Sequence, residues 1–504
     1  MRVLFYVTGH GYGHATRNAA VMNALVARRP DVELYARTEA PEWVFRNSVS
    51  APVRYQTVRV DGGMIEKDLL AQDPAATLAR AQQVFADAER IVRDEAEFVR
   101  RNEIQVIVSD IPPLASVIGR AAGVPVVAMG NFSWDYIYAP FAERLPAFAP
   151  IIEAIRECYA STDLLLRLPW SPEMEVFPRR EPIPLVAREP QGSRDETRRQ
   201  LYESGAPADR PLVLLGGRFP SLSPETLAQV LRDKRWTLLS YSDFGAGPLP
   251  GLLVLDPEWQ PRFLDVLQAC DVVVSKLGYG IASECVSCRA RVLYPPREEF
   301  AEHPFIETGL ASWVPTQRIE RAPFERGAWR EPIEALLERP FDWPDVPLNG
   351  AQVAAGASWI SRLEPAVSSA NDDRRDAQSL PILPIWQVAP TSGSYPGKTA
   401  RLAVRSRAAE RPLTCDYALR LQDGLSLQRP PLPIHIHEFT RLKAGLVLQA
   451  AAAGYVKAEV GPRLLEAPGQ FQRVEHAEGA QPTVGVFRIP VVIDTGDHGR
   501  RHLR

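Results

Sequence analysis

Short apolar runs alternate with longer segments of helical periodicity over the first third of the chain. Runs that are apolar at nearly every position predict strands buried on both faces, whereas apolar residues that recur every three to four positions predict amphipathic helices. The expected strands are residues 3–7, 32–36, 105–109 and 124–129, and the expected helices are residues 18–28, 74–101 and 114–122. This alternation is typical of a doubly wound α/β domain with a parallel sheet.

The same alternation begins again after a proline-rich passage, residues 169–190. Its expected strands are residues 212–215, 237–241, 252–255, 272–275 and 292–294, and its expected helices are residues 224–233, 262–270, 281–287 and 327–338. We therefore predict the α/β fold class, with two Rossmann-like doubly wound lobes at residues 1–168 and 191–363. Such sheets bind ligands at the carboxyl ends of their strands, so we expect the two lobes to face a common cleft.

The alternation stops near residue 363. Residues 364–398 are rich in proline, serine and aspartate without lasting periodicity, which predicts a linker. Residues 399–504 combine short strand-like pieces, such as 483–489, with arginine-rich stretches and scattered prolines. Three interpretations of this irregular C-terminal region stay open: a small additional domain, a largely disordered segment, or out-of-frame translation.

Composition narrows the class of protein only moderately. Of the 504 residues, 45% are hydrophobic and 24% are charged, as in an ordinary globular protein, and the net charge of −3 gives no argument for nucleic acid or an anionic membrane as a partner. The sequence shows no signal-peptide pattern and no apolar run of the ~18 residues that a membrane span needs. Five cysteines do not make a disulfide framework. We therefore expect a cytoplasmic protein without a transmembrane segment.

The first expected strand leads into a turn in which glycine alternates with other residues: Gly9-His10-Gly11-Tyr12-Gly13-His14. Glycine lets a ligand approach the backbone, and the helix start that follows offers free N–H groups and a positive dipole end. Gly11 and Gly13 are therefore candidate contacts to an acceptor or a sugar. His14 is a candidate general base, because the helix start favours an uncharged imidazole that can accept a proton. The alternatives are an ordinary tight turn and a histidine that only binds nearby backbone.

Polar residues also follow the third and fourth expected strands of the first lobe. Asp110 comes directly after the third expected strand, where a carboxylate would point into the ligand crevice and could orient His14 or bind hydroxyls. A helix N-cap is the alternative for Asp110. Ser133, Trp134 and Asp135 follow the fourth expected strand, and an aromatic ring beside short polar groups suits a sugar. Aromatic packing in the core is the alternative for this segment.

In the second lobe, a buried strand is followed by Lys276, by a turn containing Gly278 and Gly280, and by a helix that carries Glu284. The glycine turn and the helix start would hold a diphosphate, and Lys276 would add a compact positive charge. Glu284 could accept hydrogen bonds from two ribose hydroxyls. The alternative for Glu284 is a favourable charge near a helix start.

Two further loops of the second lobe follow strand ends. Gly216, Gly217 and Arg218 form a phosphate-sized turn with a fixed cation. The polar loop at residues 295–303 lies where the hydroxyls of a donor sugar would be bound. A charged, solvated loop is the alternative interpretation of residues 295–303.

Together these motifs resemble the glycosyltransferase-B architecture, and more narrowly the glycosyltransferase-like N-terminal domain of plant L-arabinokinases and its stand-alone bacterial relatives. The segments that carry the resemblance are residues 6–17, 108–110, 131–138 and 276–284. The chain is more distantly similar to the UDP-N-acetylglucosamine transferases of peptidoglycan synthesis. In those enzymes a glycine-rich loop ending in histidine carries the proposed base, and a Ser-Glu pair on a helix holds the nucleotide ribose. The resemblance implies these two roles for His14 and Glu284.

The chain also departs from its relatives. Nothing after Leu363 is like the Gly-Ser-Ser-Ala phosphate loop of the arabinokinases' sugar kinase domain, so the resemblance does not imply kinase activity. The first 363 residues contain no Asp-x-Asp pair that would hold a metal-bound diphosphate. We therefore expect neither a metal nor another cofactor.

The resulting hypothesis is a metal-independent glycosyltransferase. It would bind a nucleotide-diphosphate sugar, with UDP as the expected nucleotide, on the second lobe and an unknown acceptor on the first. Two alternatives stay open: a non-catalytic sugar-nucleotide sensor and a nucleotide-sugar epimerase, because fold alone does not separate these functions. The donor sugar, the acceptor, the stereochemical outcome and the oligomeric state are not predicted.

Overall fold

The chain divides into two compact units, Met1–Ala389 and Pro390–Arg504. The computed structural model describes residues 1–217, 219, 221–245 and 247–356, and beyond them only the backbone of short strands between 403 and 503. The strands of the second unit are β14 (Ala403–Ser406), β15 (Leu413–Thr414), β16 (Ile434–Ile436), β17 (Ala444–Ala451), β18 (Val456–Gly461), β19 (Val484–Val491), β20 (Ile493–Thr495) and β21 (Arg501–Leu503). They pair in the orders β15-β14-β16, β18-β17-β19 and β20-β21. The expected linker, residues 364–398, lies outside the described residues.

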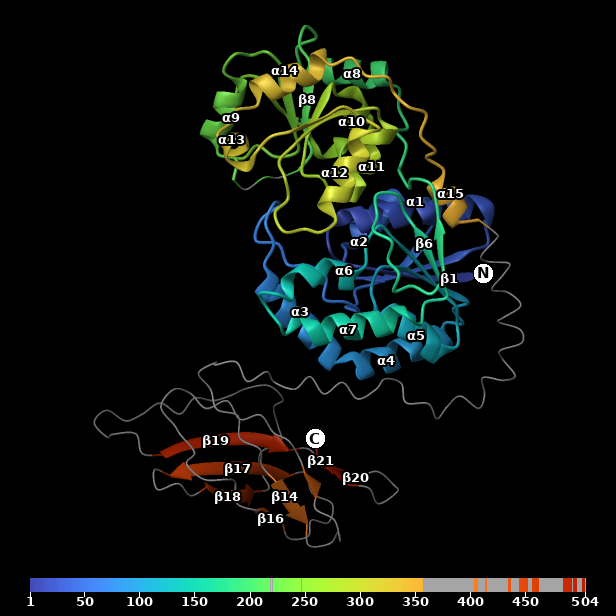
Figure 1. The fold of residues 1–504 in the computed structure, drawn as a ribbon, viewed down its shortest axis with the longest axis vertical. Coiled ribbons are helices and arrows are strands. Elements are labelled where there is room, and N and C mark those ends of the chain that lie inside the picture. The colour runs from blue at the N-terminus through green and yellow to red at the C-terminus, as the bar shows by residue number, and fades with distance from the viewer. Residues whose placement is uncertain are drawn as a thin grey trace. The chain divides into compact units, whose positions relative to one another are not determined.

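The first lobe of the first unit is built on a seven-stranded sheet. Its strands are β1 (Arg2–Val7), β2 (Glu33–Thr38), β3 (Val53–Gln56), β4 (Val106–Asp110), β5 (Val126–Gly130), β6 (Leu164–Arg167) and β7 (Arg180–Pro182). Its helical segments are α1 (Tyr12–Arg28), α2 (Glu42–Ser48), α3 (Pro74–Ala86), α4 (Ala88–Arg101), α5 (Leu114–Ala122), α6 (Trp134–Tyr138), η1 (Ala139–Phe141) and α7 (Phe148–Tyr159). The strand order is β3-β2-β1-β4-β5-β6-β7, and all neighbours are parallel. Figure 1 shows α1 on the side toward the second lobe and α4 and α5 on the opposite side.

The second lobe repeats this plan with six parallel strands. They are β8 (Leu212–Leu215), β9 (Thr237–Ser240), β10 (Leu252–Val254), β11 (Val272–Val274), β12 (Arg291–Tyr294) and β13 (Thr316–Arg318). Its helical segments are α8 (Arg194–Glu203), α9 (Pro224–Leu231), η2 (Pro257–Trp259), α10 (Phe263–Ala269), α11 (Tyr279–Ser287), α12 (His303–Ala311), α13 (Arg321–Glu325) and α14 (Arg330–Glu338). The strand order is β10-β9-β8-β11-β12-β13. The predicted α/β class with two doubly wound lobes is thus confirmed.

Two details of the first lobe differ from the sequence prediction. The long helix expected at residues 74–101 is broken at Asp87, whose backbone (φ −92°, ψ 1°) ends α3 and precedes α4. The proline-rich passage at 169–190 contributes β7, which pairs with β6 at the edge of the sheet. An edge strand tolerates proline because one of its sides needs no ladder hydrogen bonds.

After the second lobe, the chain returns to the first. Helix α15 (Gly350–Ala354) packs against α1, and Figure 1 shows the two side by side. Asn349 forms a bridge with Val186 in the segment that connects the lobes. The start of α15 lies so close to the connecting segment that position 350 needs glycine, because a Cβ atom on Gly350 would lie 2.1 Å from the carbonyl oxygen of Pro184. The sequence pattern did not predict this return.

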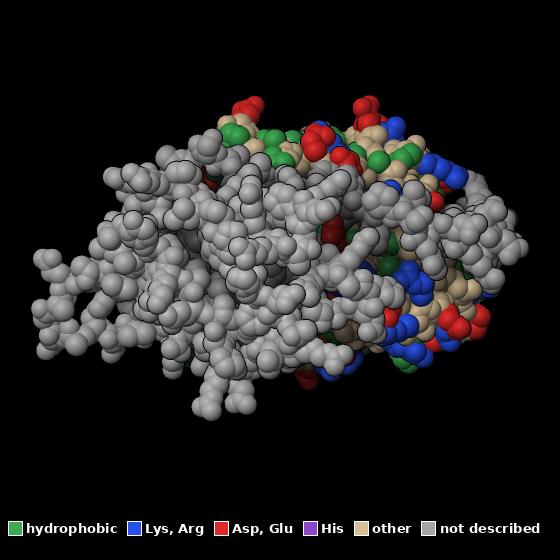
Figure 2. All heavy atoms as spheres, turned by 90° about the horizontal axis from the view of Figure 1, so that it is seen from below, with side chains coloured by type: hydrophobic (Ala, Val, Ile, Leu, Met, Phe, Trp, Pro, Cys, Tyr) green, Lys and Arg blue, Asp and Glu red, His purple; other side chains and the backbone are tan. Residues whose placement is uncertain are grey.

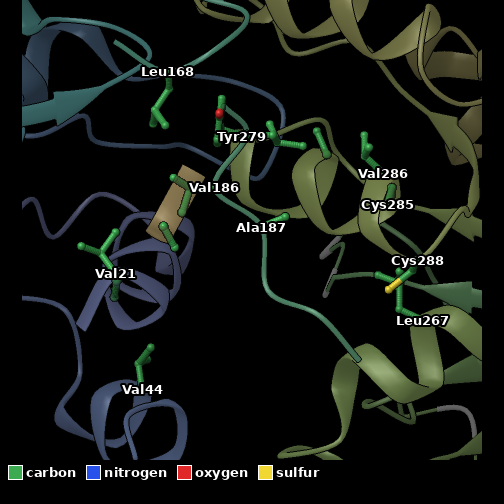
Figure 3. Close-up of a cluster of buried hydrophobic side chains, with 14 of the residues drawn as sticks. Val21, Val44, Leu168, Val186, Ala187, Leu267, Tyr279, Cys285, Val286 and Cys288 are labelled. Atoms are coloured by element: carbon green, nitrogen blue, oxygen red, sulfur yellow. The ribbon is translucent and has the colours of Figure 1, made fainter. Parts of the chain in front are cut away.

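Among the described residues, one of three hydrophobic clusters extends across both lobes. Figure 3 shows a part of it in which Val21 and Val44 of the first lobe, Val186 of the connection, and Leu267 and Cys285 of the second lobe belong to the same cluster. All five side chains are buried. Because such a cluster loses its contacts when either lobe moves away, it holds the lobes in a defined arrangement.

The surface of the described residues carries both signs of charge. Figure 2 shows acidic and basic side chains intermixed on the visible described part of one face. Among the described residues, no helix combines the length and the apolar character needed to cross a bilayer.

Candidate functional site

A cleft of about 1240 Å³ opens between the two lobes. The first lobe lines it with one side of α1 and with the aromatic rings of Tyr12 and Trp43, which are 57% and 40% exposed and meet edge to face at 5.5 Å. Exposed rings inside a cleft are available to stack on a ligand. Five of the predicted site residues line this cleft: Gly13, Gly216, Gly217, Gly280 and Glu284.

The first glycine turn has the local structure that the sequence predicted. Gly11 is the N-cap of α1 and has a φ of 74°, a backbone conformation that glycine adopts without the penalty of a side chain. His14 lies in the first turn of α1 and is buried. It does not belong to the lining of the large cleft, and it faces the carboxyl end of β4 instead.

His14 and Asp110 form a buried pair. The Nδ1 atom of His14 lies 2.9 Å from Oδ1 of Asp110, the last residue of β4. The same carboxylate accepts a hydrogen bond of 2.6 Å from Nε of Arg17 and one of 2.5 Å from Nδ2 of Asn18. Burial by itself would raise the pKa of Asp110, but the positive charge of Arg17 and the nearby His14 lower it to about 2. The carboxylate is therefore ionised at neutral pH.

This geometry sets the chemistry that the histidine can perform. Nδ1 of His14 lies 2.9 Å both from Oδ1 of Asp110, which can only accept, and from Nη2 of Arg17, which can only donate. In the tautomer with the proton on Nδ1, the carboxylate accepts that proton's hydrogen bond and Nε2 is the acceptor. The helix-cap alternative for Asp110 is not what the structure shows, since α5 begins at Leu114 after Pro113 and the carboxylate accepts from residues of α1. Asp110 contacts His14, which is the arrangement that its predicted role of orienting the histidine needs.

The pair belongs to a longer buried network that reaches the second lobe. Nη1 of Arg17 donates to Oδ1 of Asn131 at 2.8 Å, and Nδ2 of Asn131 donates to Oε1 of Glu302 at 2.7 Å. The guanidinium of Arg17 also lies over the ring of Tyr279, 5.2 Å from its centre. Arg17 was not predicted as a site residue, although its position three residues after His14 puts both on one helix face.

The aromatic segment after β5 is mostly buried. Trp134 is 1% exposed, and its Nε1 donates to Asp61 at 3.1 Å. Asp135 lies 3.3 Å from Nε of Arg156. The hydroxyl of Ser133 is buried without a hydrogen-bond partner among the described residues. Trp134 thus has the core packing that was the alternative to a direct sugar contact.

In the second lobe, Gly278 is the N-cap of α11, as the strand-turn-helix pattern predicted. Lys276 does not face open solvent, because its Nζ lies 3.1 and 3.3 Å from the two carboxylate oxygens of Glu66 in the first lobe. Nη2 of Arg297 donates to the same Glu66 at 2.9 Å. Burial, followed by the charge of Arg297, lowers the pKa of Lys276.

Glu284 is 5% exposed and pairs with Arg188, whose Nε donates to Oε1 at 2.8 Å. Burial raises the pKa of Glu284, while Arg188 acts in the opposite direction. The other oxygen, Oε2, has no hydrogen-bond partner among the described residues, so it remains available to a ligand. In the same cleft, the carbonyl of Gly216 accepts a hydrogen bond of 2.8 Å from the hydroxyl of Ser275. Arg218 lies outside the described residues.

The loop at residues 295–303 is less solvated than a charged loop usually is. Arg297 and Phe300 are 6% and 3% exposed, and the guanidinium of Arg297 stacks over the ring of Phe300 at 3.9 Å. Phe300 in turn stacks on His10 of the first glycine turn, with ring centres 5.6 Å apart. The loop therefore contributes to the contact between the lobes. Among the described residues, no three His, Cys, Asp or Glu side chains are grouped as a metal site requires.

Comparisons with known proteins agree with the predicted resemblance. Residues 1–137 match the sequence model of glycosyl transferase family 1. The chain is 29% identical over 357 residues to the L-arabinokinase of Arabidopsis thaliana, a match that covers 70% of this chain and 33% of that protein. The chain thus spans about a third of the length of this curated relative. The suspected resemblance to glycosyltransferase-like proteins is confirmed.

Two solved structures are similar to this chain over most of their own length. The glycosyltransferase of kitacinnamycin is 18% identical, with a TM-score of 0.46 over 74% of this chain and 98% of that one. The calicheamicin glycosyltransferase CalG4 is 16% identical, with a TM-score of 0.44 over 76% of this chain and 100% of that one.

Proposed function

We propose that this protein is a glycosyltransferase that moves a sugar from a nucleotide-diphosphate sugar, with UDP as the nucleotide, to an acceptor hydroxyl. The observation that carries the proposal is the buried His14–Asp110 pair at the start of α1, at 2.9 Å, within the segment that matches glycosyl transferase family 1. A histidine whose Nδ1 proton is held by an ionised carboxylate is a general base at Nε2.

In the proposed reaction, Nε2 of His14 takes the proton of the acceptor hydroxyl as its oxygen bonds to the anomeric carbon of the donor sugar. The bond from that carbon to the diphosphate breaks, and the diphosphate leaves with the electron pair. Asp110 stabilises the imidazolium that forms, as a buried carboxylate does in other histidine pairs. Arg17 keeps Asp110 ionised, so the proton stays on the imidazole.

The cleft residues of the second lobe support the donor side of the proposal. Gly216, Gly217 and Gly280 give a ligand access to the backbone, and the N-terminus of α11 favours an anion there. Oε2 of Glu284, which has no partner in the described part of the chain, would accept a hydrogen bond from a ribose hydroxyl. Arg188, which fixes Glu284, is a residue that sequence analysis missed because its partner lies 96 positions away.

The test combines binding and turnover. Calorimetric titration with UDP should show binding to the wild type and a loss of roughly tenfold or more in Glu284→Gln, since hydrogen bonds to charged groups contribute about 1.5–3 kcal/mol. Glu189→Gln is the matched control, because Glu189 is an exposed carboxylate that lines the same cleft. Consumption of a UDP-sugar with release of UDP must accompany binding. Tight binding without turnover across a broad acceptor panel would instead identify a sugar-nucleotide sensor.

A further inference from the structure

Two cations of the second lobe converge on one carboxylate of the first. Lys276 follows β11, and Arg297 follows β12, the next strand of the sheet. Both reach Glu66, with Nζ of Lys276 at 3.1 Å from Oε1 and Nη2 of Arg297 at 2.9 Å from the same oxygen. A single carboxylate therefore pairs with two cations that come from adjacent strand ends, and its one negative charge does not balance both.

The cation pair has unused binding capacity. The side chain of Arg297 is 3% exposed, yet its Nε atom is buried without a hydrogen-bond partner among the described residues. Its other acidic neighbour, Glu302, lies 3.8 Å from Nη1 and already accepts a hydrogen bond from Asn131. Buried donors are rarely left unpaired, so this guanidinium is arranged for more acceptor oxygens than Glu66 provides.

Glu66 belongs to a loop of the first lobe that is docked onto the second. In this loop, Asp68 pairs with Arg321 at 2.7 Å, and the carbonyl of Leu70 accepts from the backbone N–H of Glu298 at 2.8 Å. Leu70 is 2% exposed and is part of the hydrophobic core of the second lobe. The carboxylate is thus held against the cations by the docking of its own segment.

We propose that Lys276 and Arg297 form a site for the diphosphate of the donor, and that Glu66 occupies this site until the donor displaces it. This inference rests on the proposed function. A diphosphate carries more negative charge and more acceptor oxygens than one carboxylate, and arginine binds such groups through several N–H donors at once. Lys276 also precedes Gly278, the N-cap of α11, so the helix start adds to the attraction.

In this proposal, Glu66 competes with the diphosphate of the donor for Lys276 and Arg297. Donor binding would exchange the carboxylate for the diphosphate and release one of the contacts that hold the loop to the second lobe. Removing the charge of Glu66 must then strengthen binding of a diphosphate, whereas removing the charge of Arg297 must weaken it. A purely structural ion pair would give neither effect.

The experiment titrates inorganic pyrophosphate into the full chain by calorimetry. Glu66→Gln should bind pyrophosphate about tenfold more tightly than the wild type, and Arg297→Gln should bind it at least tenfold more weakly. Asp68→Asn is the matched control, because it removes another ion pair of the same loop and leaves the cation pair occupied. It should leave the affinity within a few-fold. Glu66→Asp keeps the charge on a shorter side chain and should fall between Glu66→Gln and the wild type, which provides a second test if Glu66→Gln folds poorly.

Two results would overturn the inference: an unchanged or weaker affinity in Glu66→Gln, or an equal gain in Asp68→Asn, which would make loop docking the limiting factor. Different results would reject the anion site and the proposed function. Pyrophosphate binding that responds to Glu66 and Arg297 supports the anion site even if no UDP-sugar is consumed. UDP-sugar turnover with a pyrophosphate affinity indifferent to both substitutions would keep the function and reject this site.

Discussion

Gly280 of α11 lies so close to Gly13 of α1 that a Cβ atom on Gly280 would stand 2.8 Å from the Cα atom of Gly13. The two glycines come from opposite lobes, and each lies at the start of its helix. Their contact brings two helix N-termini together at the edge of the cleft, which both glycines line. The glycines of the two motifs therefore allow the lobes to approach, in addition to any contact with a ligand.

We predict that Gly280→Ala destabilises the protein by about 1–3 kcal/mol, because the added methyl group meets backbone that must shift to admit it. The free energy of unfolding, measured by urea denaturation, is the readout. Gly217→Ala is the matched control: its Cβ would find no atom nearer than 3.8 Å, and its free energy of unfolding should change by no more than about 0.5 kcal/mol. Equal stability of Gly280→Ala and wild type would mean that the lobes separate readily in solution.

We predict that His14→Ala lowers turnover by about 10²–10⁴, the usual contribution of a positioned general base, and leaves the donor affinity within a few-fold. The fold should persist, because Asp110 keeps its hydrogen bonds from Arg17 and Asn18. Initial rates with a UDP-sugar measure turnover, and calorimetry with UDP measures affinity. Donor hydrolysis serves as the assay until an acceptor is known.

The second histidine of the same turn supplies the control for this experiment. His10 contacts the carbonyl of Met64 at 3.2 Å and stacks on Phe300, but no carboxylate among the described residues pairs with it. His10→Ala should therefore retain much more turnover than His14→Ala. An equal loss in both variants would attribute the effect to packing of the turn and remove the base from His14.

Much of the fold was predictable because its elements are local. The strand at residues 212–215 and the helix at 114–122 have the predicted bounds, since each follows from a short apolar run or an amphipathic period. Strand β7 was not predicted, because Arg180–Pro182 is not apolar and its pairing depends on a neighbour at the sheet edge. The return of α15 to α1 likewise depends on how the lobes dock.

The contacts of the candidate site were likewise predictable only in part. His14 and Asp110 follow β1 and β4, which are neighbours in the sheet, so the rule for carboxyl strand ends anticipates their meeting. The partner of Lys276 could not be predicted, because Glu66 lies 210 positions away and reaches it only through the contact between lobes. The partner of Glu284 was missed for the same reason.

Asp61 gives a pH-dependent prediction. Burial raises the pKa of this carboxyl to about 6, although hydrogen bonds from Thr8 and Trp134 act in the opposite direction. The unfolded chain loses this proton near pH 4, while the folded protein keeps it until about pH 6, so the folded state binds more protons in between. The contribution of Asp61 to stability is therefore fully present below pH ~4 and is lost as the pH rises through ~6.

The measurement compares Asp61→Asn with the wild type in urea denaturation at a series of pH values. The wild type should lose up to about 3 kcal/mol more stability than the variant between pH 4 and pH 7, since each pKa unit corresponds to about 1.4 kcal/mol. Other titrating groups are common to both proteins and cancel in the difference. Parallel stability profiles for the two proteins would rule out a perturbed Asp61.

The last prediction concerns the extent of the folding unit. We propose that a chain of residues 1–363 folds cooperatively and binds UDP as the full chain does, because it contains the sheets of both lobes and α15. A chain ending at residue 348 lacks α15 and the bridge from Asn349 to Val186, and it uncovers the side of α1 on which α15 packs. It should be about 1–3 kcal/mol less stable in urea denaturation, as expected for the loss of a few buried small side chains and their backbone contacts. Insoluble or non-cooperative behaviour of the 1–363 chain would assign residues beyond 363 to the core, whereas equal stability of the two shortened chains would make the contact between α15 and α1 dispensable.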